Sequence, residues 1–382
     1  MATYDLQARQ ARYFTLSSQI AHMDNAHLRS LFDATDPQRG WGRKHTLDIG
    51  HSKVFVKRLP VTDLEYNNLF STKNLYDLPT YYQYGVGSAG FGVFRELVAN
   101  IKTTNWVLQG AIANFPLLYH FRIMPFSGER PDVDMERHRE YVAYWNSNEN
   151  IGRYLLDRAN ANYELVLFLE HMPYSMDAWV LANRHQTSQV LEDLRRAITF
   201  LRKNDMVHFD ENFENVLSDG KQAYLTDFGL VLDKRFTLTQ DEALFLKQND
   251  SYDYAEVIGS VGFLLYGTYD SLSDNEKQKV RETYGIADGM HPAELTAILL
   301  NNIEEVMADG SMKLEKRYVA TSVKYRRIIL LFVDFIVSMS KNKHKDTRFP
   351  HATLARLLKE TGFLSGSISG IGQKHHLAPC YA

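Results

Sequence analysis

Two acidic motifs, separated by a short hairpin-like segment, constrain this chain more than any other feature of its sequence. In the first motif, Asp210 stands five residues before Asn215, and His208 precedes the aspartate. The second motif is an Asp-Phe-Gly triplet that begins at Asp227, at the end of an apolar run. Phosphoryl transfer needs one carboxylate that orients the attacking hydroxyl, and an amide and a second carboxylate that hold Mg²⁺ on the nucleotide phosphates. The two motifs contain this set of groups.

The segment between the motifs predicts how they meet in space. Residues 215–217 and 222–226 are short, largely apolar runs, and a Ser-Asp-Gly turn at 218–220 lies between them. This pattern is typical of two antiparallel strands joined by a tight turn. Because a hairpin returns the chain to the end from which it started, we expect Asn215 and Asp227 to face the same metal pair.

The spacing of His208, Asp210 and Asn215 matches the pattern H-x-D-x-x-x-x-N, and the triplet at Asp227 matches D-F-G. In both motifs the chain resembles the protein-kinase-like fold, which includes protein kinases and the kinases that phosphorylate aminoglycosides and choline. The resemblance implies an α+β, bilobal protein-kinase-like fold, with a small β-rich N-lobe that carries a helical insertion and a larger, mainly helical C-lobe. It also implies that Asp210 is the catalytic base and that His208 supports its loop. Asn215 and Asp227 would be the metal ligands.

A kinase-type N-lobe places a lysine on a strand, where it reaches the α- and β-phosphates. Residues 53–57 alternate polar and apolar side chains before Pro60, a strand pattern. Val-Phe-Val-Lys at 54–57 resembles the family's V-A-I-K, so Lys57 is the candidate and Lys53 the less favoured substitute. The alternative is an ordinary lysine that faces solvent.

That lysine pairs with a glutamate on the following helix in the resembling fold. We favour Glu96, because it lies in a long helical pattern that begins near residue 94 and precedes the strand-like segment 116–123. Glu65, on a shorter possible helix, is the other candidate. Choosing Glu96 implies an unusually long connection from Lys57. Either glutamate could instead be a solvated charge on a helix.

Gly40 and Gly42 are the candidates for a glycine-rich phosphate clamp. Two glycines allow the backbone to approach phosphate closely, and neighbouring cations suit an anion. A third glycine is missing, because His45 stands where G-x-G-x-x-G would place it. An ordinary surface loop is an equal alternative.

The apolar run 163–173 predicts a buried strand that ends in a turn. By resemblance this is the hinge, where backbone groups near Glu170 and Met172 would bind the adenine edge of ATP. A core strand without a ligand is the alternative. Residues 127–162 are expected to be a helical insertion, either peripheral or specific to a substrate or partner.

The chain is long enough for two lobes, with 382 residues and 45% hydrophobic side chains. We expect an N-terminal extension at 1–26 and an N-lobe at 27–172 that contains the insertion. A C-lobe at 173–363 and a flexible Gly/Ser-rich tail at 364–382 would follow.

Several residues depart from the protein-kinase pattern. Phe209 replaces the arginine that receives an activation-segment phosphate in many regulated kinases, so the chain is an atypical, non-RD member by resemblance. Asn212 replaces a lysine typical of serine/threonine kinases, and no A-P-E follows the D-F-G triplet. Glu211 and Glu214 add negative charge. This charge would either slow the chemistry or suit a cationic acceptor, such as an amine-bearing small molecule or a basic peptide. Asp253 is expected either to anchor the catalytic loop or to start a helix.

Composition narrows the class of partner. A net charge of −3 and a pI near 6.5 argue against a nucleic-acid scaffold held by bulk charge. The single cysteine, Cys380, excludes an intrachain disulfide and fits a reducing cytosol, so we expect a cytoplasmic protein. No membrane segment is expected, because the most apolar run, 328–337, is too short and contains Asp334.

The leading hypothesis is therefore an ATP- and Mg²⁺-dependent phosphotransferase that acts on a protein or small-molecule hydroxyl. One alternative is a pseudokinase that binds partners as a scaffold with weak or no catalysis. A kinase-fold enzyme that transfers AMP would use the same metal ligands, and a helical interaction protein of another class would use none of them.

Overall fold

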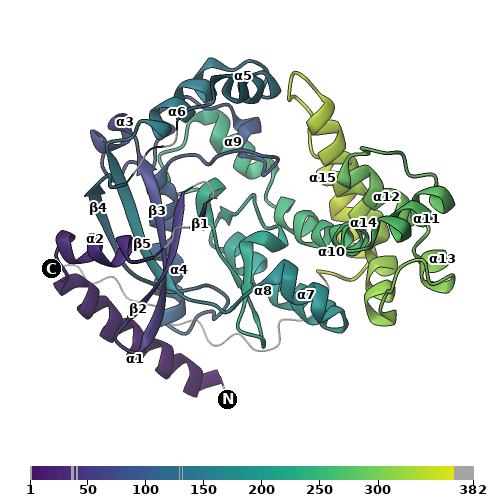
Figure 1. Cartoon of the computed structure of the whole chain (residues 1–382), viewed down its shortest axis with the longest axis horizontal. Helices are drawn as coiled ribbons and strands as arrows, with labels where there is room; N and C mark the ends of the chain where they lie inside the picture. The colour runs from purple at the N-terminus through teal and green to yellow at the C-terminus, as the bar shows by residue number, and fades with distance from the viewer. Residues whose placement is uncertain (1, 36–37, 40–41, 129, 131, 365–382) are drawn as a thin grey trace.

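The computed structural model describes residues 2–35, 38–39, 42–128, 130 and 132–364 (Figure 1). The fold is mixed α+β, with a small antiparallel sheet and a larger helical part. Helices α10 to α15 gather on the side of the molecule away from the sheet (Figure 1). Gly40, Cys380 and residues 365–382 of the expected tail lie outside the described residues.

The main sheet has five antiparallel strands in the order β1-β2-β3-β5-β4. Lys57 on β3 stands opposite Lys44 on β2 and Leu167 on β5. The expected strand at 53–57 is thus confirmed as part of a longer one. The strands are β1 (Gln38–Arg39), β2 (Arg43–Ile49), β3 (Ser52–Val61), β4 (Leu118–Pro125) and β5 (Tyr163–Glu170).

Both faces of this sheet are covered by helices. Alternate β3 residues point to opposite faces, and Leu59 and Val61 pack with Phe94 and Leu97 of helix α4 (Val93–Leu108). The other face meets two N-terminal helices, α1 (Ala2–His22) and α2 (Asn25–Asp33), which run along the sheet (Figure 1). Residue 26, the expected end of an N-terminal extension, lies inside α2, so this segment is part of the sheet's packing.

The insertion between β4 and β5 is helical, as predicted. It consists of α5 (Met135–Tyr144) and α6 (Glu149–Ala159). Trp145, between the two helices, is buried against the rings of Tyr81 and Tyr82. The insertion therefore packs on the long connection between β3 and α4, which also contains α3 (Asp63–Tyr66) and the short 3-10 helix η1 (Thr80–Gln83).

Short strands and 3-10 turns flank the two acidic motifs. The predicted hairpin is present as β8 and β9, and β6 pairs with β8. A second pair, β7 with β10, brackets the start of the first motif and the end of the second. These elements are β6 (Tyr174–Ser175), β7 (Met206–Val207), β8 (Val216–Ser218), β9 (Ala223–Leu225) and β10 (Leu232–Asp233), with 3-10 turns η2 (Arg184–Gln186), η3 (Phe213–Asn215) and η4 (Phe228–Leu230).

Helix α10 (Tyr252–Asp270) is the centre of the helical part and is buried along most of its length. Helix α8 (Thr187–Lys203) delivers the chain to the first motif, as its apolar spacing predicts. The remaining helices are α7 (Met176–Ala182), α9 (Gln240–Gln248), α11 (Asp274–Tyr284), α12 (Pro292–Asn301), α13 (Ile303–Ala308), α14 (Lys316–Lys341) and α15 (His351–Glu360). Within the described residues, no helix has the length and apolar character needed to cross a membrane.

Two glycines let α10 and α14 approach closely. A Cβ atom on Gly259 would overlap the ring of Phe332, and one on Gly262 would overlap Ile329. We predict that Gly259→Ala lowers the free energy of unfolding by about 1–3 kcal/mol, because the added methyl overpacks this contact. Chemical denaturation measures the effect.

Gly267→Ala on the same helix is the matched control, since its Cβ would meet Leu181 at an ordinary 3.4 Å. Helix propensity favours alanine there by up to about 1 kcal/mol. Equal losses of stability in the two variants would contradict the close approach at Gly259.

Candidate active site

Lys57 is a buried lysine that joins the sheet, α4 and the second acidic motif. Its Nζ donates to Glu96 Oε1 at 2.7 Å and to Asp227 Oδ1 at 2.8 Å, and its side chain is only 8% exposed. Burial by itself would lower the pKa of Lys57, but the two carboxylates outweigh it and raise the pKa above its usual value. The ammonium group is therefore charged at neutral pH.

Glu96 and Glu65, the two candidates for the partner of Lys57, have different positions. Glu96 is the one that contacts the lysine. Glu65 accepts from the backbone N–H of Thr62 at 2.9 Å, as part of a capping box, and from the N–H of Val93 at 3.0 Å. Because Val93 is the first residue of α4, Glu65 fastens the start of the helix that carries Glu96.

The structure brings the residues of the two acidic motifs together at one cavity of about 320 Å³. Asp210, Asn215 and Asp227 all line it, together with Lys57 and Glu96. The hairpin accounts for this proximity, since Thr226 N–H donates to Asn215 O at 3.1 Å and Asn215 Nδ2 donates to Asp210 O at 3.0 Å.

Asp227 adopts a strained backbone conformation, with φ of 62°. Such left-handed conformations cost roughly 1–3 kcal/mol for a residue other than glycine and recur at functional sites. Burial alone would raise the pKa of Asp227, but Lys57 outweighs burial and lowers it, so the carboxylate is ionised. The ion pair with Lys57 helps to hold this conformation.

His208 supports the loop of the first motif, as the resemblance implies. Burial lowers the pKa of His208 to about 4, so the ring is neutral. Its Nε2 donates to Thr226 O at 3.0 Å and its Nδ1 accepts from Asp210 N–H at 3.3 Å, which is one consistent tautomer. The ring thus joins the two motifs through backbone groups.

Asp253 anchors the loop of the first motif from α10. Its carboxylate accepts from the N–H groups of His208 at 2.9 Å and Phe209 at 3.0 Å. Phe209, like Asp227, has a positive φ, of 67°, so these bonds hold a strained residue. Of the two readings of Asp253, the anchor is confirmed, and its side chain makes no helix cap.

The carboxylates of the cavity outnumber its central lysine. Burial first, and the charge of Asp227 second, raise the pKa of Asp210 to about 7. Asn212 Nδ2 donates to Asp210 Oδ1 at 2.8 Å and orients that carboxyl group.

Carboxylate and amide oxygens are the protein ligands that Mg²⁺ prefers, usually one or two of them with phosphate and water oxygens completing the octahedron. Asn215 and Asp227 fit such a site by their chemistry.

The described residues contain no cluster of three or more His, Cys, Asp or Glu side chains arranged to hold a metal by themselves. A divalent ion at Asn215 and Asp227 would take its remaining oxygen ligands from water or from a bound phosphate chain.

Glu211 does not contribute the negative charge that its sequence position suggests. Its side chain is 0% exposed, and neither carboxyl oxygen has a hydrogen-bond partner among the described residues. Burial first, then the charges of Asp253 and Glu256, raise the pKa of Glu211 well above its usual value. Glu211 therefore keeps its proton to a higher pH than an exposed glutamate does, and only Glu214, which is exposed and lines the cavity, is placed for the predicted role.

This buried proton makes the stability of the protein depend on pH. The folded state holds the Glu211 proton that the unfolded state releases above its pKa of about 4.3, so stability falls as pH rises above that value. We predict that Glu211→Gln makes the fall shallower by up to about 1.4 kcal/mol per pH unit, as measured by denaturation from pH 5 upwards.

Glu214→Gln, which removes an exposed carboxylate of the same segment, is the control for Glu211→Gln. An unchanged pH slope in Glu211→Gln would mean that this carboxyl group is ionised in the folded protein.

A glycine-rich segment in the long connection between Lys57 and Glu96 forms one wall of the cavity. Residues 85–92 read G-V-G-S-A-G-F-G, and all of them except Val86 line the cavity. The G-x-G-x-x-G spacing directly before a helix was the available signal. The glycines expected to form the phosphate clamp do not form this wall. Gly42 is not among the residues that line the cavity, and it lies close to the carbonyl of Arg58. Gly40 is outside the described residues.

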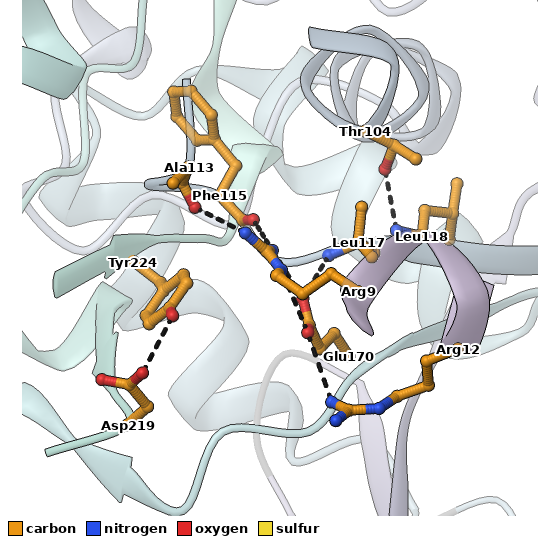
Figure 2. A network of polar contacts seen from close by, with 10 residues as sticks. All are labelled: Arg9, Arg12, Thr104, Ala113, Phe115, Leu117, Leu118, Glu170, Asp219 and Tyr224. Carbon is orange, nitrogen blue, oxygen red and sulfur yellow. Dashed lines mark hydrogen bonds and ion pairs between the residues drawn. The ribbon is translucent and has the colours of Figure 1, made fainter. Parts of the chain in front are cut away.

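The two hinge candidates also lie outside the cavity lining, and Glu170 has a structural role. Its N–H donates to Leu117 O at 2.8 Å, and its carboxylate accepts from Leu117 N–H at 3.1 Å and from Arg9 Nη2 at 2.6 Å. Figure 2 shows the guanidinium of Arg9 reaching from α1 to this carboxylate. Met172 is partly exposed just beyond β5.

Arg9 also binds the segment that precedes β4. It donates to Ala113 O at 2.8 Å and to Phe115 O at 2.6 Å, and its guanidinium lies 5.4 Å from the ring centroid of Tyr224 (Figure 2). One buried side chain of α1 therefore links the end of β5, the α4–β4 connection and β9. Nothing in the sequence around Arg9 marks it for this role.

We predict that Arg9→Ala lowers the free energy of unfolding by about 3–5 kcal/mol, because it leaves the Glu170 carboxylate buried without its cation. Arg12→Ala is the control. Arg12 approaches the same carboxylate at 3.6 Å but is 47% exposed, so its loss should cost about 1 kcal/mol or less. Similar effects of the two substitutions in chemical denaturation would refute the special role of Arg9.

A scan against models of protein families gave no match for this chain, and a search of the curated proteins gave none.

Proposed function

We propose that this protein is an ATP- and Mg²⁺-dependent phosphotransferase of the protein-kinase-like fold, which transfers the γ-phosphoryl group to a hydroxyl of a protein or small molecule. The observation that carries the proposal is the position of Lys57, paired with Glu96 and Asp227 in the cavity that Asp210 and Asn215 also line. A chance occurrence of the two motifs would not predict this convergence of four separate segments.

The architecture supports the same proposal. A five-stranded sheet, with a helix inserted between β3 and β4 that carries the lysine's partner, precedes a larger helical part. The two acidic motifs line the same cavity as Lys57 of β3 and Glu96 of α4. In a bilobal kinase-like reading, the sheet with α4 is the N-lobe and the segment from β6 onward is the C-lobe.

In the proposed reaction, Lys57 binds the phosphate chain of ATP, and Glu96 fixes the lysine. Asn215 and Asp227 would hold Mg²⁺, which supplies neutralisation of charge on the phosphates. Asp210 accepts the proton of the acceptor hydroxyl, and Asn212 holds that carboxyl group in place. The acceptor oxygen forms a bond to the γ-phosphorus, the bond to the β,γ-bridging oxygen breaks, and ADP leaves. Positioning supplies most of the rate enhancement.

Two substitutions separate binding from chemistry. Asp227→Asn should weaken Mg²⁺-dependent ATP binding, because it removes a charged metal ligand. Asp210→Asn should leave binding nearly unchanged and lower the transfer rate by about 10²–10⁴-fold, the usual contribution of a general base. Calorimetry with and without Mg²⁺ measures binding, and incubation with γ-labelled ATP and a cell lysate measures transfer.

Undiminished transfer in both variants would refute the assignment of roles. Absence of ATP binding by the wild-type chain would reject the nucleotide site itself, whereas binding without turnover would favour a pseudokinase. Label from γ-labelled ATP reaches the acceptor only if a phosphoryl group is transferred, whereas α-labelled ATP would label the acceptor only if AMP is transferred.

A further inference from the structure

The glycine-rich loop, defined as residues 85–92, has a role that its place in the chain does not predict. It precedes α4 and faces the same cavity as Lys57 and Asp227. Its tie to the second acidic motif is direct, since Phe91 N–H donates to Gly229 O at 3.0 Å. The loop is therefore fixed beside the proposed nucleotide site.

The carbonyl groups of this loop are bound by the insertion. Tyr141 Oη donates to Gly87 O at 2.7 Å, and Tyr144 Oη donates to Val86 O at 3.3 Å, both from α5. Arg158 Nη1, from α6, donates to Ala89 O at 2.8 Å. Three contacts from one insertion thus fix the orientation of the loop's peptide groups.

A planar trans peptide directs its C=O and the following N–H to opposite sides. Because the carbonyls of residues 86, 87 and 89 point to the insertion, the N–H groups of Gly87, Ser88 and Gly90 point away from it. All three residues line the cavity. These N–H groups have no hydrogen-bond acceptor among the residues that the structure describes.

The Tyr82 side chain completes the support. Its hydroxyl accepts from Ala89 N–H at 2.9 Å and lies 2.8 Å from the hydroxyl of Tyr141. Since the Tyr141 hydroxyl donates its proton to Gly87 O, Tyr82 must be the donor between the two tyrosines. The relay fixes the peptide groups on both sides of Ser88.

Glycine is required in this loop for two separate reasons. Gly87, Gly90 and Gly92 have φ values of 86°, 101° and 111°, which side chains rarely adopt. A Cβ on Gly90 would lie 3.2 Å from Gly229 O, and one on Gly85 would overlap Asp210. The backbone itself, with no side chain in the way, therefore faces the cavity at close range.

Two successive unpaired N–H groups, at residues 87 and 88, and a third at residue 90 thus belong to residues that line one cavity, and backbone N–H groups that converge in this way form a binding site for an anion. Lys44 and Lys57 line the same cavity and add positive charge. We propose that the glycine-rich loop binds the phosphate chain of the nucleotide, and that the insertion α5–α6 is the element that positions it. The identity of the anion as a nucleotide phosphate rests on the proposed function; the direction of the N–H groups does not.

The test compares ligands that differ only in phosphate. ATP with Mg²⁺ and adenosine are titrated into the full chain by calorimetry. Gly87→Ala should weaken ATP binding by about tenfold or more, because it shifts charge-assisted hydrogen bonds, and should leave adenosine binding unchanged. Gly289→Ala is the matched control: Gly289 has φ of 70° and, like Gly87, nothing within 4 Å of an added Cβ.

Tyr141→Phe is the second variant, and it removes only the hydroxyl that orients the Gly87 carbonyl. It should weaken ATP binding severalfold and spare adenosine, which a general loss of fold would not do. Wild-type affinity for ATP in both Gly87→Ala and Tyr141→Phe would overturn the role of the loop while leaving the proposed function standing.

Equal weakening of ATP and adenosine would also overturn the inference, because the loop would then act on the whole cavity and not on phosphate. If the wild-type chain bound neither ligand, the proposed function would fail first, and the loop's assignment to nucleotide phosphate would fail with it.

Discussion

The ammonium group of Lys57 is the contact on which the site depends. It is buried between two carboxylates that come from a helix and from a strained turn, so it joins the sheet, α4 and the D-F-G motif at one point. Removing one carboxylate would leave a single ion pair at the lysine, whereas removing the lysine would leave two like charges in proximity. The positions of these three side chains therefore depend on their charges as well as on packing. A bound divalent cation would offset the negative charge that the lysine leaves uncompensated.

The helical part contributes support more than reactive groups. Asp253 and Glu256, both buried on α10, accept hydrogen bonds from the backbone N–H groups of residues 208, 209 and 211 in the loop of the first motif. Burial, the larger effect, raises the pKa of Asp253 to about 6 despite these bonds. The loop thus carries a strained Phe209 because a core helix supplies acceptors for it. The close packing of α10 on α14, where glycines remove two side chains, keeps that helix in place.

Much of this arrangement could be predicted from local patterns. The strand of Lys57, the helix of Glu96 and the hairpin between Asn215 and Asp227 are all in the structure, because period and turn chemistry specify them locally. The glycine-rich loop could not be placed, since its peptide directions come from Tyr141 and Arg158, which are distant in sequence. The burial of Glu211 could not be predicted for the same reason: its neighbour Glu214 is exposed, and only the tertiary fold decides which of them is buried. The enzyme class itself stays a proposal.

The hydrogen bonds of Arg9 have a consequence for the folding of the sheet. Glu170 ends β5 inside the core, where a lone carboxylate would be strongly disfavoured, and its counterion comes from a helix more than a hundred residues earlier in the chain. Strand pairing and docking of α1 are for this reason thermodynamically coupled. The first helix acts as a built-in counterion, and a shortened chain without it would have to leave the Glu170 carboxylate buried without its cation or expose this end of β5 to water.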